Sequence, residues 1–240
     1  MHIQMKFQRY ELKYLLSPEQ KAAVCQAMAP HMAPDSFGRG TIRNIYFDTD
    51  TFRLIRRSME KPIYKEKLRL RSYTQAQPDT PVFVELKKKY RSVVYKRRLS
   101  LPEQQAMDLL CGNGGALPSD SQIAREIDYF RAYYAPLHPA VFLSYEREAW
   151  YCLDRGDFRV TFDESILWRQ QQLSLRTEVC GEPLLKYGTT LMEIKTSGGI
   201  PLWMTRVLTR QHIFQTSFSK YGSAYEQLQT QHLQGGILYA

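Results

Sequence analysis

The segment 61–98 holds twelve Lys or Arg residues against three Asp or Glu, so its excess of nine positive charges equals the formal net charge of the 240-residue chain. Within it, the run KEKLRLR places Lys65, Lys67, Arg69 and Arg71 at every second position. In a β-strand this spacing points all four cations to one face. Because aligned like charges repel one another, the pattern predicts a strand whose charged face meets a densely charged anion.

Length and composition favour one folded domain. Apolar residues make up 43% of the sequence and aromatic residues 12%, so the cations are displayed on a folded scaffold and not on a disordered polycation. We expect a single domain over residues 1–229 and a flexible tail over residues 230–240. A net charge of +9 suits nucleic acid, an acidic membrane surface or phosphorylated small molecules as partners.

Other classes of protein are excluded by spacing and hydropathy. The four cysteines form no CxxC or Cys/His ligand spacing, which argues against a zinc site. The N-terminal segment MHIQMKFQRY lacks an apolar signal region, and no apolar run approaches the roughly 18 to 20 residues of a membrane helix. We therefore expect a cytoplasmic protein, which a membrane-protein partner would have to recruit if it works at a membrane.

Strand-like alternation dominates the chain, and helical segments punctuate it. Ser17, Pro18 and Gln20 form a capping-box pattern that predicts a helix from Pro18 to about Met28. Further helices are expected over 102–110, 121–134, 202–212 and 221–229, and Cys111–Ser119 is expected to be a flexible linker. The eight predicted strands are Phe7–Tyr14, Ile42–Asp48, Tyr64–Tyr73, Val82–Lys88, Ser92–Ser100, Val141–Ala149, Phe158–Asp163 and Thr190–Thr196.

Most of these strands carry charged residues on one face and apolar residues on the other. A half-buried sheet with a solvated face explains one such strand. Repeated cationic faces favour a sheet that curls with its charged side inward, which gives a barrel with a cationic lumen and helices around it. Buried cations cost several kcal/mol each unless they are paired, so the lumen must hold water, carboxylates and an anion such as a phosphate chain. Two strands are less regular, because Leu143 shares a face with Arg147 and Ile42–Asp48 suits either face.

Eight motifs in order along the chain resemble the VTC domain, which includes the catalytic domain of the vacuolar transporter chaperone complex. The family belongs to the CYTH, or triphosphate tunnel metalloenzyme, superfamily. The resemblance spans nearly the whole chain and implies an α+β fold, with an eight-stranded antiparallel β-barrel as the triphosphate tunnel and surrounding helices. The motifs are RYELKY at 9–14, NIYFDT at 44–49, KLRLRSY at 67–73, VELKKK at 84–89, YEREAW at 145–150, RVTFD at 159–163, LMEIK at 191–195 and FSKYGSAY at 218–225.

The resemblance also implies a set of site residues. Arg69, Arg71, Arg147, Arg159 and Glu193 are the expected catalytic residues. Glu193 is the expected ligand of Mn²⁺ or Mg²⁺, with Glu11 as a second candidate, and the alternative role for Glu193 is an ion pair with Lys195 or a nearby Arg. The expected phosphate-binding residues are Lys13, Arg69, Arg71, Lys87, Lys96, Arg98, Arg147, Arg159, Lys195 and Lys220.

Two positions depart from the family pattern. Arg9 replaces the first acid of the superfamily's ExExK signature, which reduces the acidic contribution of that strand to a metal site. Ser217 stands where polymerases of the family often have a lysine, which weakens the inference of polymerisation more than that of binding.

Three functions remain open at the level of sequence. The first is a polyphosphate polymerase-like phosphotransferase, which moves the terminal phosphate of ATP onto a polyphosphate chain. The second is a metal-dependent triphosphatase acting on ATP or another triphosphate, and the third is a non-enzymatic module that binds polyphosphate or inositol phosphates. Nucleic acid is not expected as a partner, because its binding places cations on an accessible surface with stacking aromatics. Lys88, Lys89 and Arg91 are expected to form a solvated turn outside the tunnel.

Overall fold

The computed structural model describes residues 10–91, 93–112, 121–154 and 157–237. Residues 7–9 and 92 of two predicted strands, and residues 113–119 of the predicted linker, lie outside the described residues. The strands are β1 (Tyr10–Leu16), β2 (Met32–Asp48), β3 (Tyr64–Ser72), β4 (Pro81–Tyr90), β5 (Val93–Pro102), β6 (His138–Cys152), β7 (Arg159–Arg169), β8 (Glu182–Pro183), β9 (Thr190–Thr196) and β10 (Gln215–Thr216). The helices are α1 (Pro18–Met28), α2 (Arg53–Met59), α3 (Glu103–Leu110), α4 (Gln122–Tyr134), α5 (Leu202–Arg210) and α6 (Lys220–Ile237).

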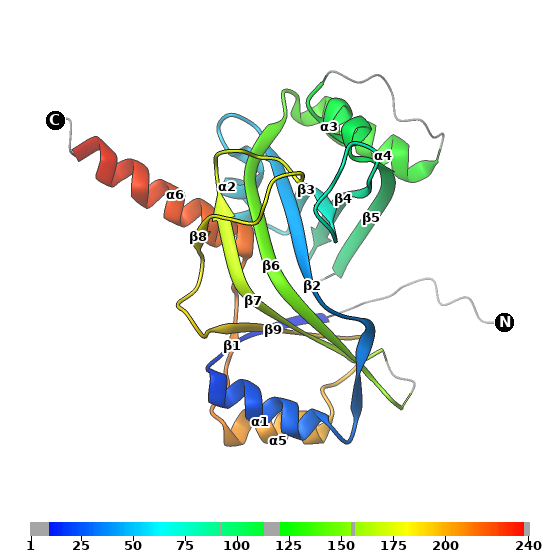
Figure 1. Ribbon diagram of the computed structural model, residues 1–240, viewed down its shortest axis with the longest axis vertical. Helices are drawn as coiled ribbons and strands as arrows, with labels where there is room; N and C mark the ends of the chain where they lie inside the picture. The colour runs from blue at the N-terminus through cyan, green and yellow to red at the C-terminus, as the bar shows by residue number, and fades with distance from the viewer. Residues whose placement is uncertain (1–9, 92, 113–120, 155–156, 238–240) are drawn as a thin grey trace.

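The strands form one antiparallel sheet in the order β10-β1-β9-β7-β6-β2-β3-β4-β5, with β8 paired to β7. Eight strands are long, and β8 and β10 have two residues each. The sheet curls strongly, and helices lie around it (Figure 1). The predicted α+β fold with an antiparallel tunnel is thereby confirmed. In the described parts of the chain no ladder joins β5 to β1 or β10, so the tunnel is a curled sheet that stays open along one seam.

Helices cover the convex side of the sheet in two separate places. Helices α1 and α5 lie side by side at the lower end in Figure 1 and pack on apolar residues of β1, β7 and β9. Helices α3 and α4 pack at the other end on apolar residues of β3, β4 and β5, such as Leu68 and Val84, which are fully buried. Because apolar residues take the convex side, the alternating charged residues are left on the concave side.

Helix α6 lies against the concave side at its N-terminal end and projects away from the sheet beyond it (Figure 1). Tyr221, Ala224 and Leu228 of α6 are buried against residues of β2, β6 and β7 that include Val141 and Leu143. The irregular strand pattern therefore has a physical cause. Leu143 shares a face with charged residues because this part of the concave side is filled by an apolar helix.

The first helix forms as its sequence predicts, because the Ser17 hydroxyl accepts a hydrogen bond from the Gln20 amide while the Gln20 side chain accepts one from the Ser17 amide. Helix α2 was not predicted. Its first amides donate to the buried carboxylate of Asp48, which lies six residues before Leu54 and outside the usual capping spacing. The last helix continues beyond Gln229 to Ile237, so the segment expected to be a flexible tail is helical over 230–237.

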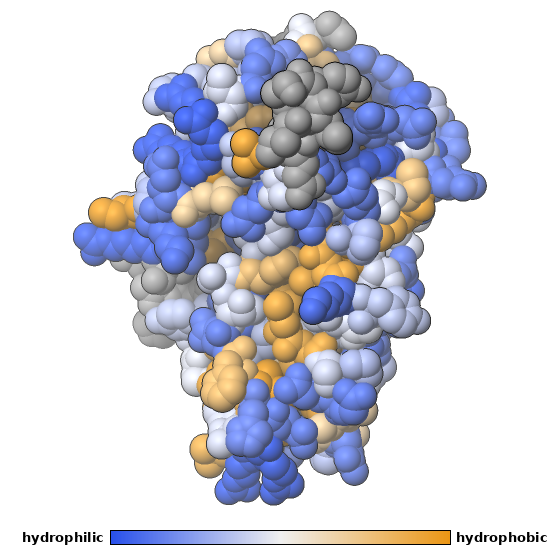
Figure 2. Space-filling model, turned by 90° about the vertical axis from the view of Figure 1, so that its left-hand side faces the viewer, coloured by the Kyte–Doolittle hydropathy of each residue, from blue (hydrophilic) through white to orange (hydrophobic). Residues whose placement is uncertain are grey.

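The outer surface on the side of α6 is mixed in character. Figure 2 shows hydrophobic residues gathered across the middle of this face, with hydrophilic residues above and below them. Among the described helices, none is both long and apolar enough to cross a membrane.

Candidate active site in the tunnel

The register of β3 and β4 fixes which side chains share the concave face. Lys67 lies opposite Lys87, and Arg69 lies opposite Glu85. Side chains in register on an antiparallel pair point to the same face, so the alternating cations of β3 face the same space as Glu85 and Lys87. The turn predicted for Lys88 and Lys89 was wrong, because β4 continues to Tyr90. Lys88 points outward and pairs with Glu126 at 3.2 Å.

Four cations converge on the carboxylate of Glu85, which is only 1% exposed. Arg69 Nη2 lies 2.7 Å from Oε2 of this carboxylate, and Lys96 Nζ lies 2.7 Å from Oε1. Arg98 donates from Nε to Oε1 at 2.8 Å, and Arg71 Nη1 lies 3.9 Å from Oε2. We call Glu85 with these four residues the Glu85 cluster. One carboxylate holds four predicted phosphate-binding residues in place and cannot neutralise them all.

The charges within the Glu85 cluster shift each other's protonation. Burial alone raises the pKa of Glu85, but Arg69, Arg71 and Lys96 outweigh it and lower this pKa well below its ordinary value. Burial lowers the pKa of Lys96 to about 8, with Glu85 opposing the shift. Glu85 is therefore ionised at neutral pH, and Lys96 loses its proton more readily than an exposed lysine does.

Arg71 is the most buried of these cations, at 4% exposed. Its Nε donates to Asn44 Oδ1 at 2.9 Å, and its Nη2 donates to the hydroxyl of Tyr145 at 2.8 Å. Neither partner is a carboxylate, so Arg71 keeps most of its charge available to a ligand. Burial raises the pKa of Tyr145, but Arg71, Arg147 and Lys220 outweigh it and lower this pKa to about 8.

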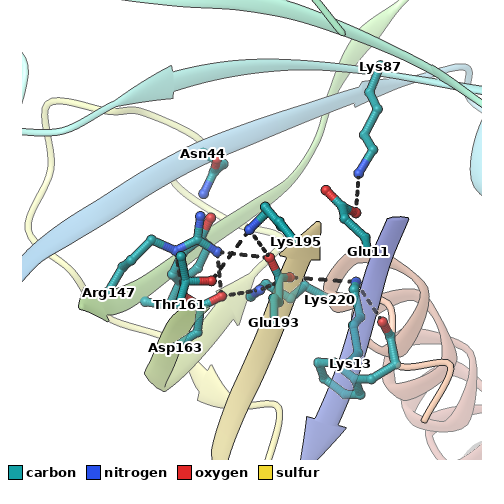
Figure 3. A network of polar contacts seen from close by, with 12 residues as sticks. Glu11, Lys13, Asn44, Lys87, Arg147, Thr161, Asp163, Glu193, Lys195 and Lys220 are labelled. Carbon is teal, nitrogen blue, oxygen red and sulfur yellow. Dashed lines mark hydrogen bonds and ion pairs between the residues drawn. The ribbon is translucent and has the colours of Figure 1, made fainter. Parts of the chain in front are cut away.

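A second cluster lies across the tunnel on β1, β6, β7, β9 and α6, and Figure 3 shows its side chains pointing toward one another. Arg147 makes two parallel bonds to the buried Asp163, at 2.6 and 2.7 Å. Lys220 of α6 donates to Asp163 at 2.5 Å and to Glu193 at 3.3 Å. Lys195 donates to Glu193 at 3.0 Å, and Lys13 Nζ lies 3.7 Å from it. We call this group the Asp163–Glu193 cluster; its members are Lys13, Arg147, Asp163, Glu193, Lys195 and Lys220.

Burial acts on both acids of this cluster, yet the cations dominate. Burial raises the pKa of Glu193, but Lys220, Lys195 and Lys13 outweigh it and hold this pKa well below its ordinary value. Burial lowers the pKa of Lys220, but Asp163 and Glu193 outweigh it and raise this pKa above its ordinary value. The ion-pair role considered for Glu193 is thus present in the structure, and its metal-binding role stays a prediction.

Three predicted site residues, Lys87, Glu11 and Arg159, lie outside these clusters. Lys87 bonds Glu11 of β1 at 2.9 Å, and Figure 3 shows the two side chains approaching from opposite walls. Arg159 pairs with Asp35 of β2 at 2.9 Å and is 43% exposed, so it lies at the edge of the tunnel. The structure therefore brings the other cations into the tunnel and leaves Arg159 outside its centre.

Sequence reasoning assigned no role to Glu85, Asp163, Asn44 or Tyr145. The signal for the two acids was present, since each shares its strand face with a predicted phosphate-binding residue. Asn44 and Tyr145 carried no such signal, because their role depends on reaching Arg71 from two other strands.

The acids of the tunnel allow a test of the expected metal. Among the described residues, no group of three or more His, Cys, Asp or Glu side chains is placed to hold a metal ion. Burial raises the pKa of Glu11, and the nearby charge of Glu193 raises it further. Lys87 and Lys195 outweigh both effects and lower this pKa to about 2. Mg²⁺ is commonly bound by one or two carboxylates with phosphate oxygens and water. The donor set fits a hard divalent cation that arrives with a phosphate ligand.

The sequence matches the VTC domain profile over residues 8–229. The chain belongs to the VTC domain family. No curated protein matches this VTC-domain sequence.

Solved structures of other proteins share the fold. A candidate adenylate cyclase from Bacillus halodurans is 18% identical, with a TM-score of 0.52, over 88% of this chain and 95% of that one. A candidate adenylyl cyclase from Hippeastrum, for which a dominant triphosphatase activity is given, is 14% identical, with a TM-score of 0.50, over 89% of this chain and 92% of that one. At these identities the likeness concerns the fold of the VTC domain.

Proposed function

We propose that this VTC domain is a phosphotransferase that binds the phosphate chain of ATP or another triphosphate in its tunnel and transfers the terminal phosphate to a polyphosphate chain. The observation that carries the proposal is the Glu85 cluster, where one buried carboxylate orients four cations without neutralising them. Such a surplus, held in fixed geometry, suits a ligand with several adjacent negative charges.

The arginines supply binding and charge stabilisation. Planar guanidinium groups bind phosphate oxygens in a bidentate manner better than ammonium groups do. Arg69 and Arg71 reach into the tunnel from the β3 wall, and Arg147 reaches in from the β6 wall, two strands away in the sheet. A triphosphate between these walls has cations on two sides, and charge that develops on the terminal phosphate during transfer is stabilised by groups already in place.

The reaction exchanges one phosphorus–oxygen bond for another. The bond between the terminal phosphorus of ATP and its bridging oxygen breaks, and ADP leaves with that oxygen. A new bond forms from an oxygen at the end of the acceptor polyphosphate to the transferred phosphorus. Lys13, Lys87 and Lys220 line the wall opposite or beside the arginines and are assigned to the acceptor or product chain.

A divalent cation fits beside the phosphates. Glu193, with Glu11, would hold Mg²⁺ or Mn²⁺ together with phosphate oxygens and water, and the cation would supply neutralisation of phosphate charge. In that role Glu193 would give up part of its contact with Lys195 and Lys220.

Hydrolysis of a triphosphate is the second candidate. It is favoured by Ser217, which is exposed and carries no charge at the position where polymerases of the family often have a lysine. Without that cation the acceptor chain has one fewer contact near Lys220, and water is the competing acceptor.

Incubation with ATP and Mn²⁺, followed by separate assays, distinguishes these functions. Phosphotransfer to a growing chain yields polyphosphate longer than three phosphates together with ADP. Hydrolysis yields free phosphate and no chains. Binding of tripolyphosphate without either product would overturn both enzymatic proposals and leave a binding module.

A further inference from the structure

Two aromatic side chains lie on the charged concave face of the sheet. Phe83 of β4 is in register with Arg71 of β3, so its ring shares the concave face with that guanidinium group. Tyr73, the residue after the end of β3, packs edge-on against Phe83, with the ring centroids 5.7 Å apart. In the described part of the chain, neither ring belongs to an apolar core cluster. Packing of the core therefore does not account for this pair.

The position of Tyr73 distinguishes it from an ordinary surface tyrosine. Tyr73 is 45% exposed, and single exposed aromatic residues are common on protein surfaces. This one, however, lies two residues beyond Arg71, about 7 Å along the chain, on the same face. An aromatic surface thus borders the cations to which the proposed function assigns the triphosphate.

Arg98 of β5 extends this surface. Its guanidinium carbon lies over both rings, 4.4 Å from the centre of Phe83 and 5.9 Å from the centre of Tyr73. Its Nε donates to Glu85 Oε1 at 2.8 Å, and its Nη2 donates to the Tyr73 hydroxyl at 2.9 Å. These contacts hold the guanidinium plane in one orientation. We call Tyr73, Phe83 and Arg98 the aromatic platform.

The donors of Arg98 are largely committed to the protein. A guanidinium group binds phosphate in a bidentate manner through Nη2 together with either Nε or Nη1. In Arg98 both Nε and Nη2 already donate, to Glu85 and Tyr73. The side chain is still partly exposed, and a guanidinium plane stacks on flat aromatic groups as an aromatic ring does. As it is held here, Arg98 is better suited to stacking than to a bidentate contact with phosphate.

We propose that the aromatic platform is a nucleobase subsite, which stacks the base of a nucleoside triphosphate whose phosphates lie at Arg69 and Arg71. The inference rests on the proposed function, which places the triphosphate at these arginines. It adds that the phosphate donor is a nucleotide and not inorganic triphosphate. Every base has a flat face on which it can stack, so the platform selects for the presence of a base without reading which base it is.

The platform also sets the direction of the bound nucleotide. In a nucleoside triphosphate the base is joined to the first phosphate through the ribose. Arg71 lies beside the platform, and Arg69 is two residues farther from it on the same strand face. A base on the platform therefore places the first phosphate nearest Arg71 and the terminal phosphate farthest from the platform.

Calorimetric titration of the whole chain with ATP and with tripolyphosphate tests the proposal. A chelator removes divalent cations, so that neither ligand is turned over during the titration. Tyr73→Ala removes the exposed ring, whereas Tyr73→Phe keeps the ring and removes the hydroxyl that accepts from Arg98. Tyr95→Ala is the matched control. Tyr95 is also 45% exposed, but it lies opposite the outward-pointing Lys88 on the outer face of β5.

Tyr73→Ala is expected to weaken the binding of ATP by roughly tenfold, as for the loss of one aromatic side chain stacked on a base. Its affinity for tripolyphosphate should stay within about threefold of the unchanged protein, because only the bond to Arg98 is lost. Tyr73→Phe and Tyr95→Ala should keep both affinities within about threefold. Tyr73 lies outside the apolar clusters, so the variants should fold, and their melting temperatures check this.

Equal losses of affinity for ATP and tripolyphosphate in Tyr73→Ala would overturn the subsite, because they would show that Tyr73 acts only by holding Arg98. Unchanged ATP affinity in Tyr73→Ala would overturn it too, as would a loss in Tyr73→Phe that equals the loss in Tyr73→Ala. In each case the proposed function stands if the unchanged protein binds tripolyphosphate and turns over ATP with Mn²⁺. If the unchanged protein binds neither ligand, the triphosphate site at the arginines fails, and the subsite fails with it.

Discussion

The Glu85 cluster and the Asp163–Glu193 cluster each hold four cations, but the first has one carboxylate and the second has two. In the first, a single acid fixes guanidinium and ammonium groups and leaves most of their charge unbalanced. In the second, each acid has cations on both oxygens, and α6 contributes one of them. The Glu85 cluster therefore suits the binding of an anion. The Asp163–Glu193 cluster stabilises the fold and has acids that a metal could share.

The largest expected effect tests the Asp163–Glu193 cluster. Glu193→Gln leaves Lys195 and Lys220 with less compensation, so we expect the free energy of unfolding to fall by about 3–5 kcal/mol without an anion present. Urea denaturation measures this loss, and added tripolyphosphate should recover part of it. Glu126→Gln, at an outer ion pair, should change stability by less than about 1 kcal/mol. Equal losses in the two variants would show that the tunnel acid has no special structural role.

The next largest effect tests the Glu85 cluster. Arg71→Ala removes a buried cation whose close partners are the neutral Asn44 and Tyr145, so we expect kcat/KM for ATP to fall by roughly two to three orders of magnitude. Steady-state kinetics with Mn²⁺ measure the change. Lys88→Ala, on the outer face of the next strand, should stay within a few-fold of the unchanged protein. The opposite ranking would place the polyanion on the outer surface and contradict the tunnel site.

A smaller effect compares ligands. Tripolyphosphate binds only the folded state and relieves repulsion in the Glu85 cluster, so at about 100 times its Kd it should add about 2.7 kcal/mol of stability. For a chain of this size we expect the melting temperature to rise by roughly 5–10 °C. Sulfate at the same concentration should give a smaller shift, since it spans fewer of the cations. Equal shifts with the two anions would indicate nonspecific binding.

The smallest expected effect concerns pH. The pKa of Lys67 is lowered to about 7 in the folded state from 10.5, first by burial and then by Lys13 and Lys87. Between these values the unfolded chain binds more protons, so stability rises with pH from about 7 to 10.5 through this group. Lys67→Met should lack about 1 kcal/mol of that rise, because water reaches the part-buried ammonium and limits the repulsion. Urea denaturation at pH 7 and pH 10 measures it, and parallel changes in both proteins would contradict the shift.

Local patterns in the sequence predicted much of the fold. The alternation in KEKLRLR placed Arg69 and Arg71 on one strand face, where the structure has them, and the Ser17–Gln20 capping box predicted α1 correctly. These succeed because strand alternation and helix capping depend on residues a few positions apart. Helix α2 was missed because its cap, Asp48, belongs to the end of a strand and reaches the helix across a turn.

The candidate site also depends partly on local sequence patterns and partly on the tertiary structure. The sequence by itself determined that the chain carries a concave basic face and belongs to a family of phosphate tunnels, because side-chain parity and motif order are properties of the chain. Only the tertiary structure decided which carboxylate holds which cation. Glu85 gathers side chains from β3 and β5, and Lys220 of α6 reaches the acids of β7 and β9. Such pairings depend on distances between strands far apart in sequence, and those distances are set by how the sheet curls and where α6 packs.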